Sequence, residues 1–408
     1  MNIHFYCWLE AEMAFTHIDC FSGVGGLCTG LHAAGFVTCV AIESVQSCVD
    51  TYSANHPSVH VIHSDIRNVP KDKIISFIPK DGIDLVSSGM PCETFSTAGN
   101  TSRSFYDERQ FLYREGIRIA KIANAKLLLF ENVPAITSKK ISRNSSTLIV
   151  DVMKKDLAEA GYGNFIEIVL YSHLFGIPQK RNRFFILACK DPSWKLSYPQ
   201  QQFRKGVTVS EAFAGLPNVI PNTDDDLKDY VKIKADNTRY VDLIRNDIFW
   251  NRGKKHCAIV SYQKAMKHRP CTLERFSLLL PGESLKNLFD KYDGEERTEL
   301  QKRRVLPKKM FIKRNYRLIN EEPSPTVTSH CLDEFVHPNY DRALTVRECA
   351  RLQSFPDSYD FRGGPYIVPH IDRDIQDKYE QIGDAVPPLL AYEWGKEISK
   401  ILKCNNCW

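Results

Sequence analysis

The chain has 408 residues, 43% of them hydrophobic and 25% charged, with a formal net charge of +5. This is the composition of an ordinary soluble protein, and no run approaches the ~18 consecutive apolar residues of a membrane span. The length suits a full α/β domain and a smaller second domain. Thirteen scattered cysteines without a signal peptide fit free thiols in a reducing compartment, so we expect a cytoplasmic protein.

A strand, a glycine-rich turn and a helix are expected near the N-terminus. The apolar run from Ile18 leads into Asp19-Cys20-Phe21-Ser22-Gly23-Val24-Gly25-Gly26, and a helix over Leu27–Ala34 stops at Gly35. Glycines allow close approach to the backbone, and a helix N-terminus offers N–H groups to an anionic group. The turn is a candidate cofactor cradle. It is not a nicotinamide fingerprint, because Cys28 stands at the third glycine position.

Acidic residues follow the next two expected strands. Val37–Ile42 ends in Glu43, where a carboxylate can accept both hydroxyls of a ribose. The third strand, Val59–Ile62, precedes Asp65 and Ile66, and the Asp65 carboxylate could accept from an exocyclic adenine amine. Either acid alone is more often a solvated loop residue. Three successive strands with such features favour a nucleoside-containing cofactor.

A cysteine, Cys92, lies on the polar stretch Ser87–Gly99. It follows Ile83–Val86, a short apolar run, so the thiol falls just past the carboxyl end of an expected parallel strand, where open α/β sheets place their chemistry. Pro91 fixes the backbone angle immediately before the thiol. An isolated cysteine is usually a small buried hydrophobe, so this stretch alone leaves nucleophile and core residue equally open.

Further polar residues are expected at the same sheet edge. Residues 99–104 suggest a lid before a helix over 108–123, and the strand Lys126–Phe130 then ends in Glu131, beside Cys92. A helix over 147–160 leads into a hairpin of Ile166–Tyr171 and Arg183–Ala188. Alternation at its second strand puts Gln179, Arg181 and Arg183 on one face. Two arginines on one face of a buried sheet need an anion or a polar ligand.

Beyond about Trp194 the alternation of strand and helix stops, Pro217–Asp229 resembles a linker, and two acid-free basic runs follow. The first holds Arg252, Lys254, Lys255, Lys264, Lys267 and Arg269; the second holds Lys302, Arg303, Arg304, Lys308, Lys309, Lys313, Arg314 and Arg317. A solvated face is the usual explanation of one such run. Two in one region favour a polyanion.

Regular structure is expected again near the C-terminus. A helix within Arg342–Pro356 has Thr345 as N-cap, Glu348 completing a capping box and Pro356 as its stop. A turn over Gly383–Pro388 leads into an amphipathic helix over 389–402. Cys404 and Cys407 form a lone CxxC without a second ligand pair, so no metal site is expected.

In this order and spacing the chain resembles the DNA (cytosine-5) methyltransferases of bacterial restriction-modification type, from about Thr16 to the last helix, excluding much of residues 195–320. The matching segments are Asp19–Gly26, Gly89–Cys92 with Phe95-Ser96, Glu131–Val133, Gln179 with Arg181 and Arg183, the helix within Arg342–Pro356, and Gly383–Pro388. Any one of these is weak evidence, and together they are strong.

The resemblance implies S-adenosylmethionine as methyl donor, duplex DNA as substrate and a cytosine turned out of the helix. It implies catalytic roles for Cys92, Glu131, Arg181 and Arg183, and cofactor contacts from Phe21, Ser22, Gly23, Gly25, Gly26, Glu43, Asp65, Ile66, Pro91, Asp384 and Ala385. DNA contacts are expected from Arg252, Lys254, Lys255, Lys264, Lys267, Arg269, Lys308, Lys309, Lys313 and Arg314. Cys20, Glu93 and Asp384 depart from the usual residues of the family, and Glu93 adds a negative charge beside the thiol.

The expected fold is α/β, with a Rossmann-like methyltransferase sheet covered by helices on both faces and a smaller, irregular DNA-recognition domain. We expect catalytic and cofactor-binding residues in 13–195, completed by 376–408, a target-recognition domain and hinge in 196–375, and a disordered extension in 1–12, with Met13 as a possible start. We expect a monomer that shares its target with a restriction endonuclease without contacting it. An RNA cytosine methyltransferase and a catalytically silent DNA-binding paralogue are the alternatives.

Cys92→Ser should abolish methyl transfer while leaving cofactor affinity within a few fold, because an alcohol is a much weaker nucleophile than a thiolate. Turnover with labelled methyl donor and calorimetric cofactor titration measure the two effects. Turnover near the wild-type level would contradict the role of Cys92.

Overall fold

The computed structural model describes residues 14–91, 108–142, 144–222, 230–232, 238–252, 259–309, 314–368 and 375–405. The predicted nucleophile Cys92, the predicted lid, Lys254, Lys255, Lys313 and the N-terminal extension lie outside these ranges.

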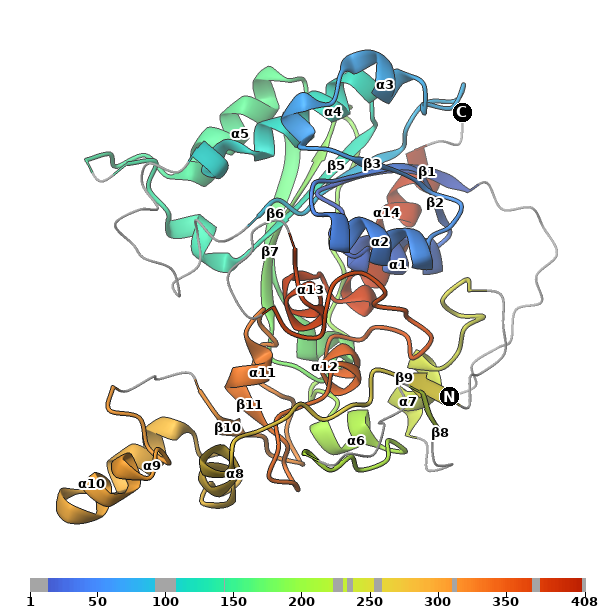
Figure 1. Cartoon of the computed structure of the whole chain (residues 1–408). Helices are drawn as coiled ribbons and strands as arrows, with labels where there is room; N and C mark the ends of the chain where they lie inside the picture. The colour runs from blue at the N-terminus through green and yellow to red at the C-terminus, as the bar shows by residue number, and fades with distance from the viewer. Residues whose placement is uncertain are drawn as a thin grey trace.

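A seven-stranded sheet in the order β3-β2-β1-β4-β5-β7-β6 forms the centre of the protein (Figure 1). Its strands are β1 Phe15–Cys20, β2 Phe36–Glu43, β3 His60–His63, β4 Leu85–Ser88, β5 Leu127–Asn132, β6 Asn164–Tyr171 and β7 Asn182–Cys189. Neighbours among β1 to β5 are parallel, whereas β7 runs antiparallel to both β5 and β6. The predicted strands and hairpin are confirmed. All five parallel strands therefore present their carboxyl ends at one edge.

Helices cover both faces of the sheet because its central strands are apolar on both sides. Along β5, Leu127 and Leu129 pack into one buried cluster, and Leu128 and Phe130 pack into another. The second cluster is closed by α3 Lys71–Ile75, α4 Tyr113–Ala123 and α5 Ile149–Glu159, and the first by α1 Gly26–Ala33, α2 Gln46–Asn55 and α14 Pro388–Asn405. The predicted three-layer α/β fold is confirmed.

The last helix belongs to the sheet although it ends the described chain. On α1, a Cβ added to Gly30 would lie 2.2 Å from the Pro388 carbonyl oxygen at the start of α14. On α14 itself, Trp394 is fully buried against Phe185 of β7, with ring centroids 5.3 Å apart. Close backbone contact at one end and aromatic packing along the helix hold α14 in place.

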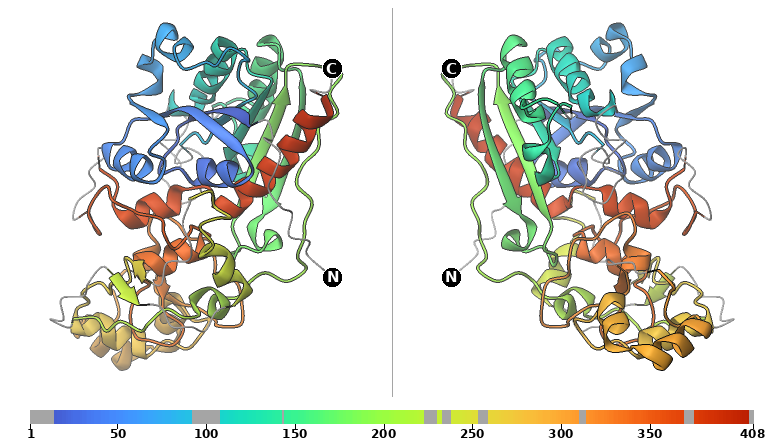
Figure 2. Two further views of the ribbon diagram at one scale, coloured as in Figure 1. Left: turned by 90° about the vertical axis from the view of Figure 1, so that its right-hand side faces the viewer. Right: turned by 90° about the vertical axis from the view of Figure 1, so that its left-hand side faces the viewer.

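The other elements lie mainly beyond the carboxyl edge of the sheet, and among them α12 Val346–Leu352 and α13 Lys378–Asp384 lie nearest to it (Figure 1 and Figure 2). They are α6 Val209–Phe213, α7 Arg239–Ile244, α8 Pro270–Ser277, α9 Leu285–Lys291, α10 Gly294–Lys302, α11 Cys331–Glu334, α12 Val346–Leu352, α13 Lys378–Asp384, and the short strands β8 Tyr230–Lys232, β9 Ile259–Ser261, β10 Tyr316–Arg317 and β11 Phe335–Val336. The 3₁₀ turns are η1 Ile66–Asn68, η2 Glu108–Phe111, η3 Pro134–Ser138 and η4 Ser172–Phe175. Around α8 to α10 a small apolar cluster of its own includes Phe276, Leu288 and Leu306.

The helix α12 starts as predicted and ends early. Thr345 and Glu348 form the capping box, but the helix stops at Leu352, and Ser354 adopts a left-handed φ of 64° before Pro356 is reached. The final turn is also shorter than predicted, because Gly383 and Asp384 form the end of α13. A local hydrogen-bond motif, rather than the proline, ends α12, because the Phe355 N–H donates to the Ala350 carbonyl at 2.9 Å and the Ser354 N–H to the Arg351 carbonyl at 3.0 Å.

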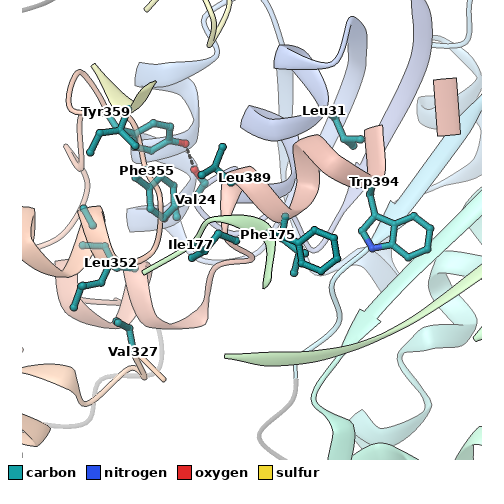
Figure 3. Packing of buried hydrophobic residues seen from close by; sticks show 14 of the residues in the cluster. Val24, Leu31, Phe175, Ile177, Val327, Leu352, Phe355, Tyr359, Leu389 and Trp394 are labelled. Carbon is teal, nitrogen blue, oxygen red and sulfur yellow. Dashed lines mark hydrogen bonds between the residues drawn. The ribbon is translucent and has the colours of Figure 1, made fainter. Parts of the chain in front are cut away.

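The segment after α12 joins the elements beyond the sheet edge to the sheet. Phe355 and Tyr359 pack near Leu352, and the Tyr359 hydroxyl donates to the Val24 carbonyl of the glycine-rich turn (Figure 3). On α12, the buried Arg351 makes two hydrogen bonds to Asp357, at 3.0 and 2.7 Å. This segment is therefore anchored by buried polar contacts as well as by packing.

None of the helices within the described ranges is long and apolar enough to cross a membrane.

Asp357→Asn should lower the free energy of unfolding by about 3–5 kcal/mol, because Arg351 would keep its charge in a site without water. Chemical denaturation measures the loss. Asp290→Asn, which removes an exposed partner of Lys286, should cost at most about 1 kcal/mol. Equal losses in the two variants would contradict this assignment.

Candidate active site

The glycine-rich turn between β1 and α1 is held by the carboxylate that ends β2. The Gly23 N–H donates to Glu43 Oε2 at 2.8 Å, and the N–H groups of Ser44 and Val45 donate to Oε1, each at 2.8 Å. Burial raises the pKa of Glu43, and the amide hydrogen bonds from Val45, Gly23 and Ser44 partly offset that rise. Each carboxylate oxygen has two lone-pair directions, so these three donors leave one direction, on Oε2, for a further donor.

Only part of the turn is open to a ligand. Gly23 has a φ of 51°, and an added Cβ there would meet nothing within 4 Å. At Gly25 an added Cβ would lie 2.9 Å from His56 Nε2, and at Gly26 it would lie 2.3 Å from the Val386 carbonyl oxygen. At Gly25 and Gly26 the absence of a side chain is therefore already required by protein neighbours, and their contact with a cofactor stays a prediction.

The turn also leaves a polar atom without a partner. Ser22 is 7% exposed, and its Oγ has no hydrogen-bond partner among the described residues. Phe21, before it, adopts a left-handed φ of 56°, which turns the chain sharply away from β1. A small polar group of a ligand could form a hydrogen bond with Ser22 Oγ, and Phe21 beside it offers an apolar surface. The turn therefore suits a cofactor with both polar and apolar parts.

The other predicted cofactor residues lie around this edge. Asp65 binds Arg67 in an exposed ion pair, Ile66 is buried, and Pro91 is exposed at the end of the described segment after β4. Asp384 is exposed and accepts a hydrogen bond from Gln376 Nε2 at 3.0 Å. Ala385 is close to Gly26, from which an added Cβ would lie 3.3 Å from the Ala385 Cβ.

A buried ion pair stands at the carboxyl end of β5. Arg183 Nε lies 2.6 Å from Glu131 Oε1, and each residue is 8% exposed. Burial raises the pKa of Glu131, and the charges of Arg183 and Arg181 oppose that rise. A Cβ added to Gly89 would lie 3.7 Å from Glu131 Oε2, which places this carboxylate beside the segment that leads into Cys92.

The remaining residues of the predicted arginine face have different roles. Gln179 donates to the Leu352 carbonyl at 3.0 Å and accepts from the Val327 N–H at 3.0 Å, so it holds the segment around α12. Arg181 Nη1 donates to the Val327 carbonyl at 2.6 Å. Burial alternates here as predicted, because Gln179, Arg181 and Arg183 are buried and Lys180 is exposed, although the regular strand β7 begins only at Asn182.

The C-5 cytosine-specific DNA methylase family matches residues 15–400 of this chain. The chain belongs to that family. Members transfer a methyl group from S-adenosylmethionine to C5 of cytosine in DNA.

Individual relatives agree with the family. The chain is 32% identical over 388 residues to the Type II methyltransferase M.DdeI of Desulfomicrobium norvegicum, covering 94% of this chain and 88% of the relative. It is 28% identical over 390 residues to M1.HphI of Haemophilus parahaemolyticus, covering 95% and 88%. Among solved structures, a prophage-encoded protein of E. coli described as a DNA modification methyltransferase gives a TM-score of 0.71 at 25% identity, covering 96% of this chain and 100% of that one.

The first predicted basic run divides between buried and exposed residues in this methylase. Arg252 donates to Asn55 Oδ1 at 2.9 Å and to the Ser358 carbonyl at 3.2 Å, with its guanidinium 5.2 Å from the Tyr359 ring centroid. It is held by protein partners, so it is not among the DNA contacts proposed below. Lys264 is half-buried, whereas Lys267 and Arg269 are exposed.

The second run divides in the same way. Arg317, predicted as part of a cationic surface, is buried and paired with Asp341 at 2.5 Å. Lys308 and Lys309 are exposed, and Arg314 is exposed and lies 3.3 Å from Asp333. Burial within a run of charges depends on contacts between distant segments, which the run itself does not reveal.

The sequence did not point to Tyr359 or Arg351. Tyr359 donates a hydrogen bond to the Val24 carbonyl of the glycine-rich turn, and Arg351 of α12 donates one to the Ala212 carbonyl. The aromatic spacing of Phe355, Tyr359 and Phe361 after a capped helix was the available signal.

Arg183→Met should raise the pKa of Glu131 further, because the cation that opposes the effect of burial is gone. A carboxyl whose pKa is higher in the folded than in the unfolded protein stabilises the fold fully at pH values below its unfolded-state pKa. This stabilisation is lost as the pH rises through the folded-state pKa. The variant should therefore lose stability relative to wild type as pH increases from acid to neutral, measured by denaturation at several pH values. Arg118→Met, at the half-exposed pair with Glu115, should show little such dependence. Parallel pH profiles for wild type and Arg183→Met would contradict the pairing.

Proposed function

We propose that this methylase acts on duplex DNA through a covalent bond between the Cys92 sulfur and C6 of a cytosine turned out of the helix. The observation that carries the proposal is the buried Glu131–Arg183 pair beside the segment ending at Pro91, immediately before Cys92. A nucleophile and a proton-holding carboxyl at adjacent strand ends are what activation of cytosine requires.

The chemistry explains the two residue types. C5 of cytosine is a weak nucleophile. Addition of a thiolate to C6 makes C5 the electron-rich carbon of an enamine. In its neutral form Glu131 donates its hydrogen to N3, and its other oxygen accepts from the exocyclic amine. A carboxyl whose pKa is raised by burial suits this donation. After C5 has gained the methyl group, loss of the C5 proton to a base and elimination at C6 release Cys92 as thiolate.

Arginines at the same edge would position the substrate. Arg183 fixes the Glu131 carboxyl from the neighbouring strand, and Arg181 is anchored through the Val327 carbonyl. We assign both to holding the extruded nucleotide and its phosphate, and their charge would favour the thiolate form of Cys92.

S-adenosylmethionine, when bound, supplies a methyl group on a positively charged sulfur. Glu43 would accept from a ribose hydroxyl with the remaining lone pair on Oε2, Ser22 and the open face of Gly23 would receive the polar methionine end, and Phe21 would give apolar contact. Asp65 would have to exchange part of its contact with Arg67 to accept from the adenine amine. Ile66, Pro91, Asp384 and Ala385 complete the proposed pocket wall.

Residues 196–375 would supply target recognition and the hinge. The exposed cations Lys267, Arg269, Lys308, Lys309 and Arg314 support this, as do the DNA modification enzymes among the relatives. We further propose that the protein is the modification enzyme of a restriction-modification system and works as a monomer. Transfer of labelled methyl to duplex DNA and to tRNA tests the substrate class, and preferential transfer to tRNA would overturn it.

Glu131→Gln should lower kcat by about 10²–10⁴-fold with little change in DNA affinity, because the amide imitates the neutral carboxyl's hydrogen bonds but provides no acidic proton. Single-turnover methylation and DNA titration separate the two quantities. Glu167→Gln, whose half-exposed carboxylate binds Lys154, is the matched control and should keep wild-type turnover. A kcat within threefold of wild type would remove Glu131 from the chemistry.

Replacing Lys267, Arg269, Lys308 and Lys309 together with Ala should weaken binding to all duplex sequences. The salt dependence should become less steep, by about 0.9 in log–log slope for each phosphate that the protein no longer neutralises. Affinity measured at several salt concentrations gives the slope. Lys155→Ala with Lys400→Ala removes exposed charge from α5 and α14 and should leave the slope unchanged. An unchanged slope in the fourfold variant would place the DNA elsewhere.

A further inference from the structure

Behind the cofactor turn, a cysteine and two histidines converge in the protein interior. Cys28 and His32 stand one helical turn apart on α1, and His56 directly follows α2. Cys28 Sγ lies 3.3 Å from His32 Nε2 and 3.8 Å from His56 Nδ1, and the three atoms lie within 4.8 Å of one another. Cys28 and His56 are buried and His32 is half-buried, which leaves a path from the surface. Catalysis uses none of these side chains.

The hydrogen bonds around His56 fix the position of its lone pair. Thr29 Oγ1 donates its only hydrogen to the Gly25 carbonyl at 2.7 Å. His56 Nε2, 3.2 Å from Thr29 Oγ1, must then be the donor of that contact. The other ring nitrogen, Nδ1, therefore carries the lone pair, and it faces Cys28 Sγ.

His32 presents a second lone pair to the same sulfur. Its Nε2 accepts from the Thr38 N–H at 3.4 Å, and a backbone N–H can only donate. Two imidazole lone pairs and one sulfur thus lie close together, with the Thr38 N–H serving His32 and the thiol hydrogen of Cys28 available to His56. A ring nitrogen that accepts a hydrogen bond keeps its lone pair, which is the form that binds metal.

We propose that Cys28, His32 and His56 form a zinc site. Thiolate sulfur and imidazole nitrogen are the donors that Zn²⁺ prefers, and bond lengths of about 2.3 and 2.0–2.1 Å require a sulfur-to-nitrogen distance of about 3.6 Å in a tetrahedral site. The two distances from Cys28 bracket that value. The hydrogen bond from His56 Nε2–H to Thr29 is the outer contact that orients a ligating histidine.

The surroundings provide a fourth position and a compensating charge. Thr38 Oγ1 lies 3.3 Å from Cys28 Sγ and 3.0 Å from His32 Nε2, so its hydroxyl, or a water bound to it, completes the set. From Thr38, His17 and Ser87 lead by hydrogen bonds to the fully buried Asp19. Zinc with one thiolate carries a net charge of about +1, which an ionised carboxylate on this network would balance.

A metal ion bound here would link α1 to the residue that follows α2. The link would lie directly behind the glycine-rich turn, because Gly25 packs against His56. Metal binding would therefore support the cradle without touching the cofactor or the DNA. The proposal is independent of the methyl-transfer mechanism proposed above.

The test is titration of the untagged, chelator-treated full chain with Co²⁺, followed by Zn²⁺ as competitor. We expect one equivalent of Co²⁺ with a thiolate-to-cobalt charge-transfer band, displaced by one equivalent of Zn²⁺. Cys28→Ser should abolish the band. Thr29→Val, which removes only the outer hydrogen bond, should weaken Zn²⁺ binding by about 10- to 100-fold. Cys39→Ser, at a half-buried thiol on β2, and Cys404→Ser in the terminal CxxC should change nothing.

Absence of the band at stoichiometric Co²⁺, or its persistence in Cys28→Ser, would overturn the proposal and leave the cluster as a hydrogen-bonded core. If Cys28→Ser does not fold, His32→Gln decides the question, because His32 reaches the surface. Wild-type Zn²⁺ affinity in His32→Gln would also overturn the site, and a loss of tenfold or more supports it.

Discussion

The catalytic edge depends on a carboxylate and a guanidinium that are held together out of water. Glu131 and Arg183 belong to neighbouring antiparallel strands, β5 and β7, so their contact exists only when the hairpin after α5 has added β7 next to β5. Burial alone would drive the carboxyl to its neutral form, and the arginine alone would keep it ionised. These two opposing effects set the pKa of a carboxyl that lies beside Gly89, three residues before Cys92 in the sequence.

This edge is completed from the other end of the chain. The segment after α12 reaches the glycine-rich turn through Tyr359 and Val24, and Gly26 packs against the backbone of Val386. Gln179, just before β7, binds both α12 and Val327. The cofactor turn, the hairpin and the elements beyond the sheet edge are thus one connected packing unit. A change in the position of α12 would therefore shift the glycine-rich turn through the contact between Tyr359 and Val24.

Local signals in the sequence predicted much of this arrangement. Each central strand is a short apolar run ended by a polar residue, and the Thr345–Glu348 capping box lies within four residues, so both follow from neighbours along the chain. Contacts across long separations were not predictable in this way. Gln179 is hydrogen-bonded to Leu352, and Arg252 to Asn55. The partners are far apart in the sequence, and no periodic pattern of residues predicts such pairs. The same reason explains why a charge run predicted one cationic surface although Arg317 is buried, and why the close protein neighbours of Gly25 and Gly26 were not predicted.

The central claim is that Cys92 attacks C6 of a cytosine held by Glu131. It is tested most directly with a random duplex library synthesised with 5-fluorocytosine, because fluorine at C5 cannot leave as a proton does and the final elimination is blocked. With S-adenosylmethionine present, the account predicts a stable protein–DNA adduct whose peptide mass maps to Cys92 and which Glu131→Gln forms much more slowly. An adduct at another cysteine, or methyl transfer to ordinary duplex DNA without any trapped adduct, would contradict it.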